Sequence, residues 1–183
     1  MSALAEYDIQ RYVHIPMAKH RRTVAFSILG TSLDAGQGPK RWEKWRPTVA
    51  LCGHDDLEID RLVLVTTRES SSLLRVVTED IARVSPGTVV EPIEVSWGDP
   101  WDFERVYGAL HDVARDLRFE PSREELLVHI TTGTHVAQIC LFLLTESRWL
   151  PGRLLQTSPP RQRETGVTGS FATIDLDLSR YDR

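Results

Sequence analysis

The sequence predicts an α/β protein with a twisted, doubly wound sheet of five to six mostly parallel strands and helices on both faces. Two observations lead to this prediction. Apolar, β-rich runs alternate with helical patterns along the chain, as right-handed crossovers between parallel strands require. The 183 residues also suffice for one α/β domain with a full core, whereas a second domain would be cramped.

Six runs are expected to form strands, and the last of them is expected to be antiparallel. In chain order they are residues 23–29, 62–66, 88–95, 126–130, 153–156 and 171–176. If the strand order is 3-2-1-4-5, strands one and four are neighbours where the order reverses. Doubly wound sheets bind ligands at the carboxyl ends of the strands at this switch point.

Each of the first five strands is expected to be followed by helical sequence, which gives five strand–helix units. Residues 45–51 have Pro47 near a helix start, residues 70–84 show helical spacing, and residues 101–117 have Asp99 as the expected N-cap and Pro100 in the first turn. The fourth helix begins near Gly133 and Thr134. Its expected buried stripe consists of Val136, Ile139, Cys140, Leu143 and Leu144.

Residues 1–22 are expected to be an irregular extension and residues 23–183 the domain. The formal net charge of -4 argues against a surface that coats duplex nucleic acid or anionic lipid. Cys52 and Cys140 lie among apolar residues, and neither they nor the histidines have metal-ligand spacing, so we expect buried free thiols, no metal and no cofactor. Without an apolar run of about 18 residues or a signal peptide, a cytoplasmic protein with no membrane partner is expected.

Two turns provide the strongest indication of a site. Gly30, Thr31 and Ser32 follow the first strand, and Thr131, Thr132, Gly133, Thr134 and His135 follow the fourth. Glycine permits close backbone approach, hydroxyls donate hydrogen bonds, and a helix N-terminus favours an anion such as phosphate. Alternatively, Thr132 or Thr134 merely caps the helix. His135 could bind a phosphate as an imidazolium or, with a nearby hydroxyl, cut a phosphodiester.

Cations and tryptophans alternate between Lys40 and Arg46. This pattern suits a nucleotide, because cations meet phosphates while an indole stacks on a base, and it also suits an amphipathic helix start with solvated charges. We retain Trp42 and Arg46 as candidate ligands and assign Trp45 to the core. Arg161 and Arg163, in the Pro- and Gly-rich loop after the fifth strand, could close over a phosphate or simply keep the loop solvated. His129, inside a strand, is expected to be a hydrogen-bonded core residue.

Several long stretches resemble one known family. They are residues 23–26, 41–42, 44–48, 100–104, 129–140, 158–161 and 174–181, within a match from about Arg22 to Asp182. The chain resembles the N-terminal sensor domain of the RtcR family, the sigma-54-dependent regulators of the RNA terminal phosphate cyclase and RNA ligase operon.

This resemblance implies a CARF domain, a Rossmann-like sensor that forms a homodimer and binds cyclic oligoadenylates or related RNA ends in the dimer crevice. It implies that an ATPase domain and a DNA-binding domain follow the sensor, with sigma-54 RNA polymerase as a partner. Many CARF domains have lysine or arginine where this chain has His135. That departure leaves room for another RNA terminus, such as a 2′,3′-cyclic phosphate. The expected ligand residues are Gly30, Thr31, Ser32, Trp42, Arg46, Thr131, Thr132, Gly133, Thr134, His135, Gln138 and Arg161.

Two functions are therefore carried forward. The first is a ligand-binding sensor with no catalytic residue. The alternative is a metal-independent nuclease of the type in which a CARF domain cleaves cyclic oligoadenylate, with Ser32, Thr132 and His135 as its parts.

Overall fold

The computed structural model describes residues 21–36, 38–161 and 168–174. Its strands form one sheet in the order β3-β2-β1-β4-β5-β6. They are β1 (Arg22–Ile28), β2 (Arg61–Thr66), β3 (Val89–Glu94), β4 (Glu124–His129), β5 (Arg153–Ser158) and β6 (Ser170–Ile174). Strands β1 to β5 are parallel and β6 is antiparallel to β5, so the predicted fold class, strand order and antiparallel last strand are confirmed.

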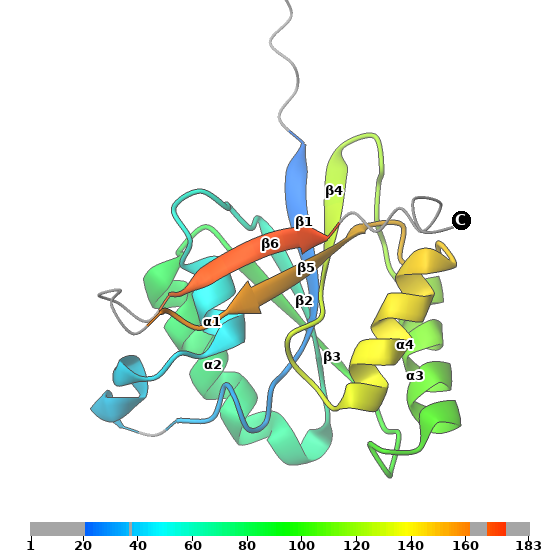
Figure 1. Ribbon diagram of the computed structural model, residues 1–183, viewed down its shortest axis with the longest axis horizontal. Helices are drawn as coiled ribbons and strands as arrows, with labels where there is room; N and C mark the ends of the chain where they lie inside the picture. Colours follow the sequence, from blue (N-terminus) through cyan, green and yellow to red (C-terminus); the bar gives the residue numbers. More distant parts are fainter. Residues whose placement is uncertain (1–20, 37, 162–167, 175–183) are drawn as a thin grey trace, which may run out of the picture.

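Two layers of helices cover the sheet (Figure 1). The helices are α1 (Pro47–Cys52), α2 (Ser71–Val84), α3 (Phe103–Asp116) and α4 (His135–Glu146), with the short 3-10 helices η1 (Pro39–Glu43) and η2 (Arg68–Ser70). Helices α1 and α2 pack together on one face, and α3 and α4 pack together on the other. In the described part of the chain, no helix is both long and apolar enough to cross a bilayer.

The central strands carry apolar side chains on both faces because helices cover both. In β1, Val24 and Phe26 belong to the core under α3 and α4, whereas Ala25 belongs to the core under α1 and α2. This alternation follows the two-residue period of a strand. Cys52 and Cys140 are buried and free, as predicted, and burial raises the pKa of the Cys52 thiol to about 12.

Two local predictions are wrong. Among the described residues no helix follows the fifth strand, and the chain returns to pair β6 with β5, with Ser158 opposite Ser170. Helix α3 begins at Phe103, and its N-cap is Asp102, whose carboxylate accepts a hydrogen bond from the Arg105 amide at 3.2 Å. Asp99 instead accepts a hydrogen bond from the Trp101 amide at 2.9 Å and forms a turn before the helix.

The predicted buried face of α4 is also partly wrong. Cys140 and Leu144 are buried, but the side chains of Ile139 and Leu143 are 51% and 39% exposed. The helix is apolar around most of its circumference, so its sequence period does not determine which side faces the sheet. Its buried face is formed by Ala137, Cys140, Leu141, Leu144 and Thr145.

Candidate functional site

A cavity of about 800 Å³ opens at the carboxyl ends of β1 to β4. Half of the predicted ligand residues line it, namely Gly30, Thr31, Ser32, Gly133, Thr134 and His135. Strands β1 and β4 are parallel neighbours, so the turns that follow them lie at the same edge of the sheet. The predicted meeting of these turns at the switch point is therefore confirmed.

The two turns are in direct contact through Thr132. Its hydroxyl donates a hydrogen bond to the carbonyl oxygen of Ile28 at 2.5 Å, just before the β1 turn. A Cβ atom on Gly30 would lie only 3.0 Å from the Thr132 methyl carbon, so this close approach requires glycine. Thr132 is fully buried, and the prediction that it contacts the ligand is wrong because its hydroxyl is used between the strands.

A buried polar network lies beneath the turns. His129 makes hydrogen bonds through Nδ1 to Ser27 Oγ and through Nε2 to Thr157 Oγ1, both at 2.9 Å. This joins β1, β4 and β5 and confirms the prediction of a hydrogen-bonded core histidine. Burial lowers the pKa of His129 to about 3, so the ring is neutral. The Thr131 hydroxyl accepts a hydrogen bond from the Thr157 amide at 2.8 Å, which fastens Thr131 to β5 rather than to the cavity.

Helix α4 presents its N-terminus to the cavity. Thr134 is the N-cap, and its hydroxyl oxygen accepts a hydrogen bond from the Ala137 amide at 3.2 Å, so the capping interpretation is confirmed for Thr134. The same hydroxyl donates to the Pro100 carbonyl oxygen at 2.9 Å and ties the β3–α3 loop to the turn. Gly133 has a φ of 90°, which other residues rarely adopt. The amides in the first turn of the helix and its dipole favour an anion here.

Two further predicted ligand residues, His135 and Gln138, lie on different sides of this turn. His135 is exposed, and the centroid of its ring lies 6.0 Å from that of Trp101 at the mouth of the cavity. Gln138 does not line the cavity. Its amide nitrogen donates to the carbonyl oxygens of Thr131 and Gly133 at 3.4 and 3.3 Å, so it supports the turn from behind.

Asp34 fixes the turn after β1, a role that the sequence analysis missed. Its buried carboxylate accepts hydrogen bonds from the Gly30 amide at 2.9 Å, the Thr48 amide at 2.9 Å and the Thr48 hydroxyl at 2.6 Å. Burial raises the pKa of this carboxyl group, and these hydrogen bonds offset part of the rise. An aspartate four residues after the turn glycine was the available signal, since such side chains often bond nearby amides.

The prediction that Arg46 binds phosphate is contradicted by its burial. Its side chain is 3% exposed, and Nη1 lies 2.6 Å from a carboxylate oxygen of Asp80 on α2. Its Nε donates to the Asp34 carbonyl oxygen at 2.9 Å. Arg41 binds the same Asp80 carboxylate through Nε and Nη2 at 2.7 and 2.8 Å. Burial raises the pKa of Asp80, but the two arginines outweigh it and hold the pKa below its usual value.

The remaining basic and aromatic candidates lie outside the cavity lining. Trp42, in η1, packs against Arg41, whose guanidinium carbon lies 5.4 Å from the ring centroid. Trp45 is half-buried but belongs to neither of the two core clusters, so its assignment to the core stays a prediction. Arg161 is exposed after β5, and its phosphate role stays a prediction, while Arg163 falls outside the described residues.

The turns after β2 and β3 complete the cavity, and the sequence analysis did not consider them. They contribute Thr67, Arg68, Glu69, Ser70, Ser96, Trp97 and Trp101 among others. The signal was the predicted strand order itself, because all the parallel strands end at the same edge of the sheet.

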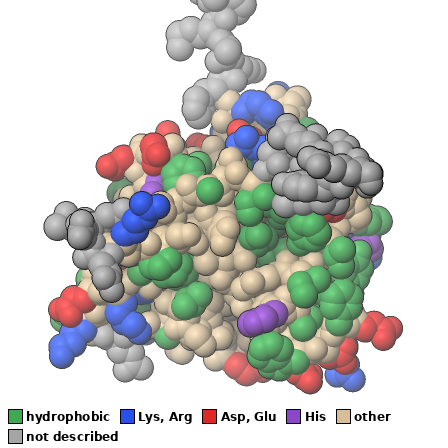
Figure 2. All heavy atoms as spheres, viewed as in Figure 1, with side chains coloured by type: hydrophobic (Ala, Val, Ile, Leu, Met, Phe, Trp, Pro, Cys, Tyr) green, Lys and Arg blue, Asp and Glu red, His purple; other side chains and the backbone are tan. Residues whose placement is uncertain are grey.

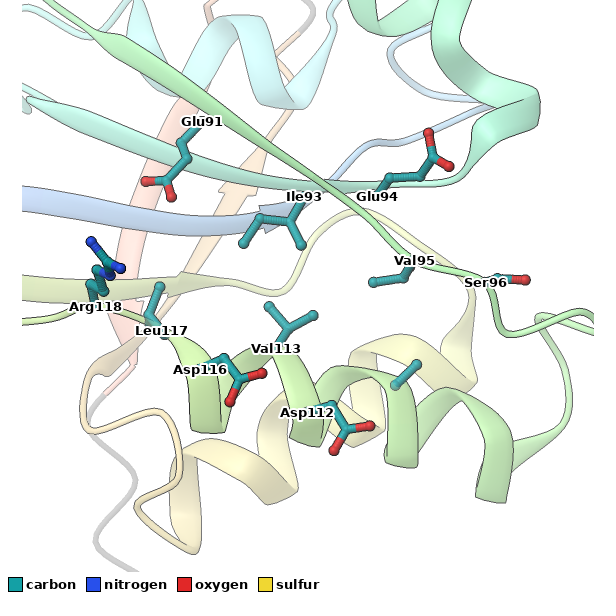
Figure 3. A pocket seen from close by; sticks show the side chains of 11 residues that line it. Glu91, Ile93, Glu94, Val95, Ser96, Asp112, Val113, Asp116, Leu117 and Arg118 are labelled. Atoms are coloured by element: carbon teal, nitrogen blue, oxygen red, sulfur yellow. The ribbon is translucent and has the colours of Figure 1, made fainter.

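A second cavity of about 440 Å³ lies between β3 and α3 (Figure 3). Its rim carries Glu91, Asp112 and Asp116 over an apolar floor that includes Ile93 and Val113. Glu91 pairs with Arg61 at 3.0 Å, and both aspartates pair with Arg115. Arg118 also lines this groove, and no group of acidic, histidine or cysteine residues in the described part of the chain is arranged to hold a metal ion.

Comparison with known proteins identifies the family. The family model described as the regulator of RNA terminal phosphate cyclase, RtcR, matches residues 21–183. The chain belongs to the RtcR family. Transcriptional regulatory protein RtcR of Escherichia coli (strain K12) is 56% identical over 164 residues, which are 88% of this chain and 31% of that protein. The chain therefore spans about a third of the length of this RtcR relative.

Solved structures support the fold of this RtcR-family domain. Enterococcus italicus Csm6, solved with cyclic hexa-2'-fluoro-hexa-dAMP, matches with a TM-score of 0.64 and 14% identity, over 88% of this chain and 44% of that one. Can2 from Sulfobacillus thermosulfidooxidans, in complex with cyclic tetra-adenylate, matches with a TM-score of 0.53 and 13% identity, over 82% and 36%. At these identities the likeness concerns the fold alone.

A first prediction concerns Arg46. The substitution Arg46→Ala should lower the free energy of unfolding by about 3 kcal/mol, because the buried Asp80 loses its one fully buried cationic partner among the described residues. Urea denaturation at pH 7 measures this. The control Arg75→Ala removes an exposed pair with Glu79 and should change stability by only about 0.5 kcal/mol. Equal stability of Arg46→Ala and wild type would contradict the structural role.

A second prediction concerns His129. The unfolded chain takes up a proton on this ring below about pH 6.5, whereas the folded protein does not until about pH 3. The folded state therefore loses stability as the pH falls through this window, by up to about 1.4 kcal/mol per pH unit. His129→Gln removes this titration. Its unfolding free energy should fall less than that of wild type between pH 6.5 and 4.5, measured by urea titrations, and equal slopes would refute the assignment.

Proposed function

We propose that this domain is a sensor that binds an RNA end, such as a 2′,3′-cyclic phosphate, or a short oligoadenylate. The observation that carries the proposal is the cavity in which the Gly30 turn meets the N-terminus of α4, at the switch point of an RtcR-family chain. Backbone amides, the hydroxyls of Thr31 and Ser32 and the imidazole of His135 are suitable donors for a phosphate. The nucleotide ligands of Csm6 and Can2 support this class of ligand.

We favour a sensor over a nuclease. A metal-independent nuclease needs a general acid or base and an activated hydroxyl beside the scissile bond. Of the three residues considered for this role, Thr132 is fully buried and donates to the Ile28 carbonyl oxygen. Ser32 and His135 line the cavity, but no hydrogen bond in the described structure joins them.

We also propose that the sensor is a homodimer that pairs through α4. Ile139 and Leu143 lie on the same exposed side of the helix as His135, which begins it at the cavity. Figure 2 shows hydrophobic side chains gathered over this part of the molecule. A helix that is apolar nearly all round is normally covered, and a second copy would cover it while placing two cavities side by side.

In the longer protein, ligand binding would control an ATPase domain and a DNA-binding domain that follow the sensor, and through them transcription by sigma-54 RNA polymerase. The 31% coverage of the E. coli relative leaves length for such domains. The membership of the RtcR family supports transcription of RNA repair genes as the output.

Ligand binding can be tested by fluorescence anisotropy. Labelled RNA trinucleotides that end in a 2′,3′-cyclic phosphate, a 3′-phosphate or a 3′-hydroxyl are compared with cyclic tetra-adenylate, and the samples are then resolved by gel to detect cleavage. We expect retention without cleavage.

His135→Ala removes one donor beside the α4 turn and should weaken RNA binding, by about 1 kcal/mol for one lost hydrogen bond. Failure of every RNA and of cyclic tetra-adenylate to bind would contradict the proposed function. Cleavage of a bound ligand would favour the nuclease over the sensor.

The dimer can be tested by sedimentation velocity. A charge on the exposed side of α4, as in Leu143→Glu, should convert the dimer to a monomer, because an unpaired carboxylate would be buried at the interface. The control Val89→Glu alters another exposed apolar residue, 63% exposed at the edge of the sheet, and should leave the dimer intact. A monomeric wild type, or a dimeric Leu143→Glu variant, would exclude pairing through α4.

A further inference from the structure

We infer that the loops after β2 and β3 form a nucleobase subsite, with Trp101 as the stacking surface and Glu94 as the acceptor for an exocyclic amino group. The ligand would carry few phosphates and end in adenine or cytosine rather than guanine or uracil. This inference rests on the proposed function, because it assigns the base of a nucleotide whose phosphate occupies the α4 turn.

Trp101 has the position and rigidity of a stacking surface. Its side chain is 61% exposed at the cavity, next to the ring of His135. The backbone on both sides is held, since Asp99 accepts from the Trp101 amide and Thr134 donates to the Pro100 carbonyl oxygen. An exposed indole on a held backbone beside an anion site can stack on a base.

The charges that line the cavity limit the phosphate count. The described residues that line it include one arginine, Arg68, and two carboxylates, those of Glu69 and Glu94. The arginines Arg41 and Arg46 are committed to Asp80 elsewhere. A ligand with many phosphates gains affinity from clustered cations, which these residues do not offer. A second copy of the chain would bring the same set of charges, so a single terminal phosphate suits the cavity better than a ring of phosphates.

Glu94 supplies the base-reading group. Figure 3 shows its carboxylate directed away from the groove that holds Asp112 and Asp116. It makes no hydrogen bond or ion pair with the described residues, unlike Glu69, whose carboxylate is bonded to Thr67 and to its own backbone. A carboxylate only accepts hydrogen bonds. It therefore favours the amino groups of adenine and cytosine and repels the O6 and O4 acceptors that guanine and uracil present at the corresponding position.

The test uses fluorescein-labelled RNA trinucleotides that share a 2′,3′-cyclic phosphate and differ only in the 3′-terminal base. Wild type should bind the adenosine end about 10-fold more tightly than the uridine end. Glu94→Gln should bring the two affinities together, because an amide can also donate to O4. Trp101→Ala should weaken binding of every RNA about 10-fold, and Trp101→Phe should restore most of it. The control Glu91→Gln changes a carboxylate of the other groove and should preserve the preference.

The outcomes separate this inference from the proposed function. Equal binding of all four bases, or a preference that survives Glu94→Gln, overturns the base subsite and leaves the sensor function in place. Failure of every RNA to bind overturns both. Sedimentation of Trp101→Ala is measured in parallel, and weaker binding that accompanies loss of the dimer would assign Trp101 to the subunit interface instead.

Discussion

The hydrogen bond from Thr132 to the Ile28 carbonyl oxygen is the interaction on which the site depends. It joins the ends of β1 and β4 where one turn bears Gly30 and the other leads to α4. The network of Ser27, His129 and Thr157 supports it from below and extends the connection to β5. Buried polar groups are costly unless they are satisfied, so this part of the sheet has little freedom to rearrange. The amides and hydroxyls at the cavity are consequently fixed before a ligand arrives, which reduces the entropy lost on binding.

The buried charges of this domain stabilise the fold and do not line the cavity. Asp80 holds Arg41 and Arg46 between α2 and the segment before α1, and Arg46 also holds the backbone at Asp34. The strongest basic run of the chain therefore secures the turn after β1 instead of contacting a ligand. The proposed recognition would then rely on the backbone amides, hydroxyls, His135 and tryptophans that line the cavity. Such a site suits a weakly charged ligand and agrees with the acidic balance of the whole chain.

Helix α4 connects the core, the cavity and the proposed dimer. Its first turn faces the cavity, one side packs on the sheet and α3, and a third side leaves Ile139 and Leu143 exposed. Because these features belong to one rigid element, a ligand at His135 and a second subunit at Leu143 would act on the same helix. Such a helix can link ligand binding to the arrangement of subunits if the two states differ in how α4 packs.

The sequence by itself determined the α/β class and the two turns, because these depend on local spacing and on the general geometry of parallel sheets. It offered the 3-2-1-4-5 strand order and a capping role for Thr132 or Thr134 only as possibilities. The family resemblance added the CARF assignment. Only the tertiary structure decided which polar side chains face the cavity. In the sequence alone, Arg46 and Thr132 have the character of ligand residues. In the fold each bonds to a partner more than 30 positions away: Arg46 to Asp80, and Thr132 to the Ile28 carbonyl oxygen. The exposed side of α4 and the contribution of Trp101 were likewise invisible, because burial depends on the packing of distant segments and not on the local pattern.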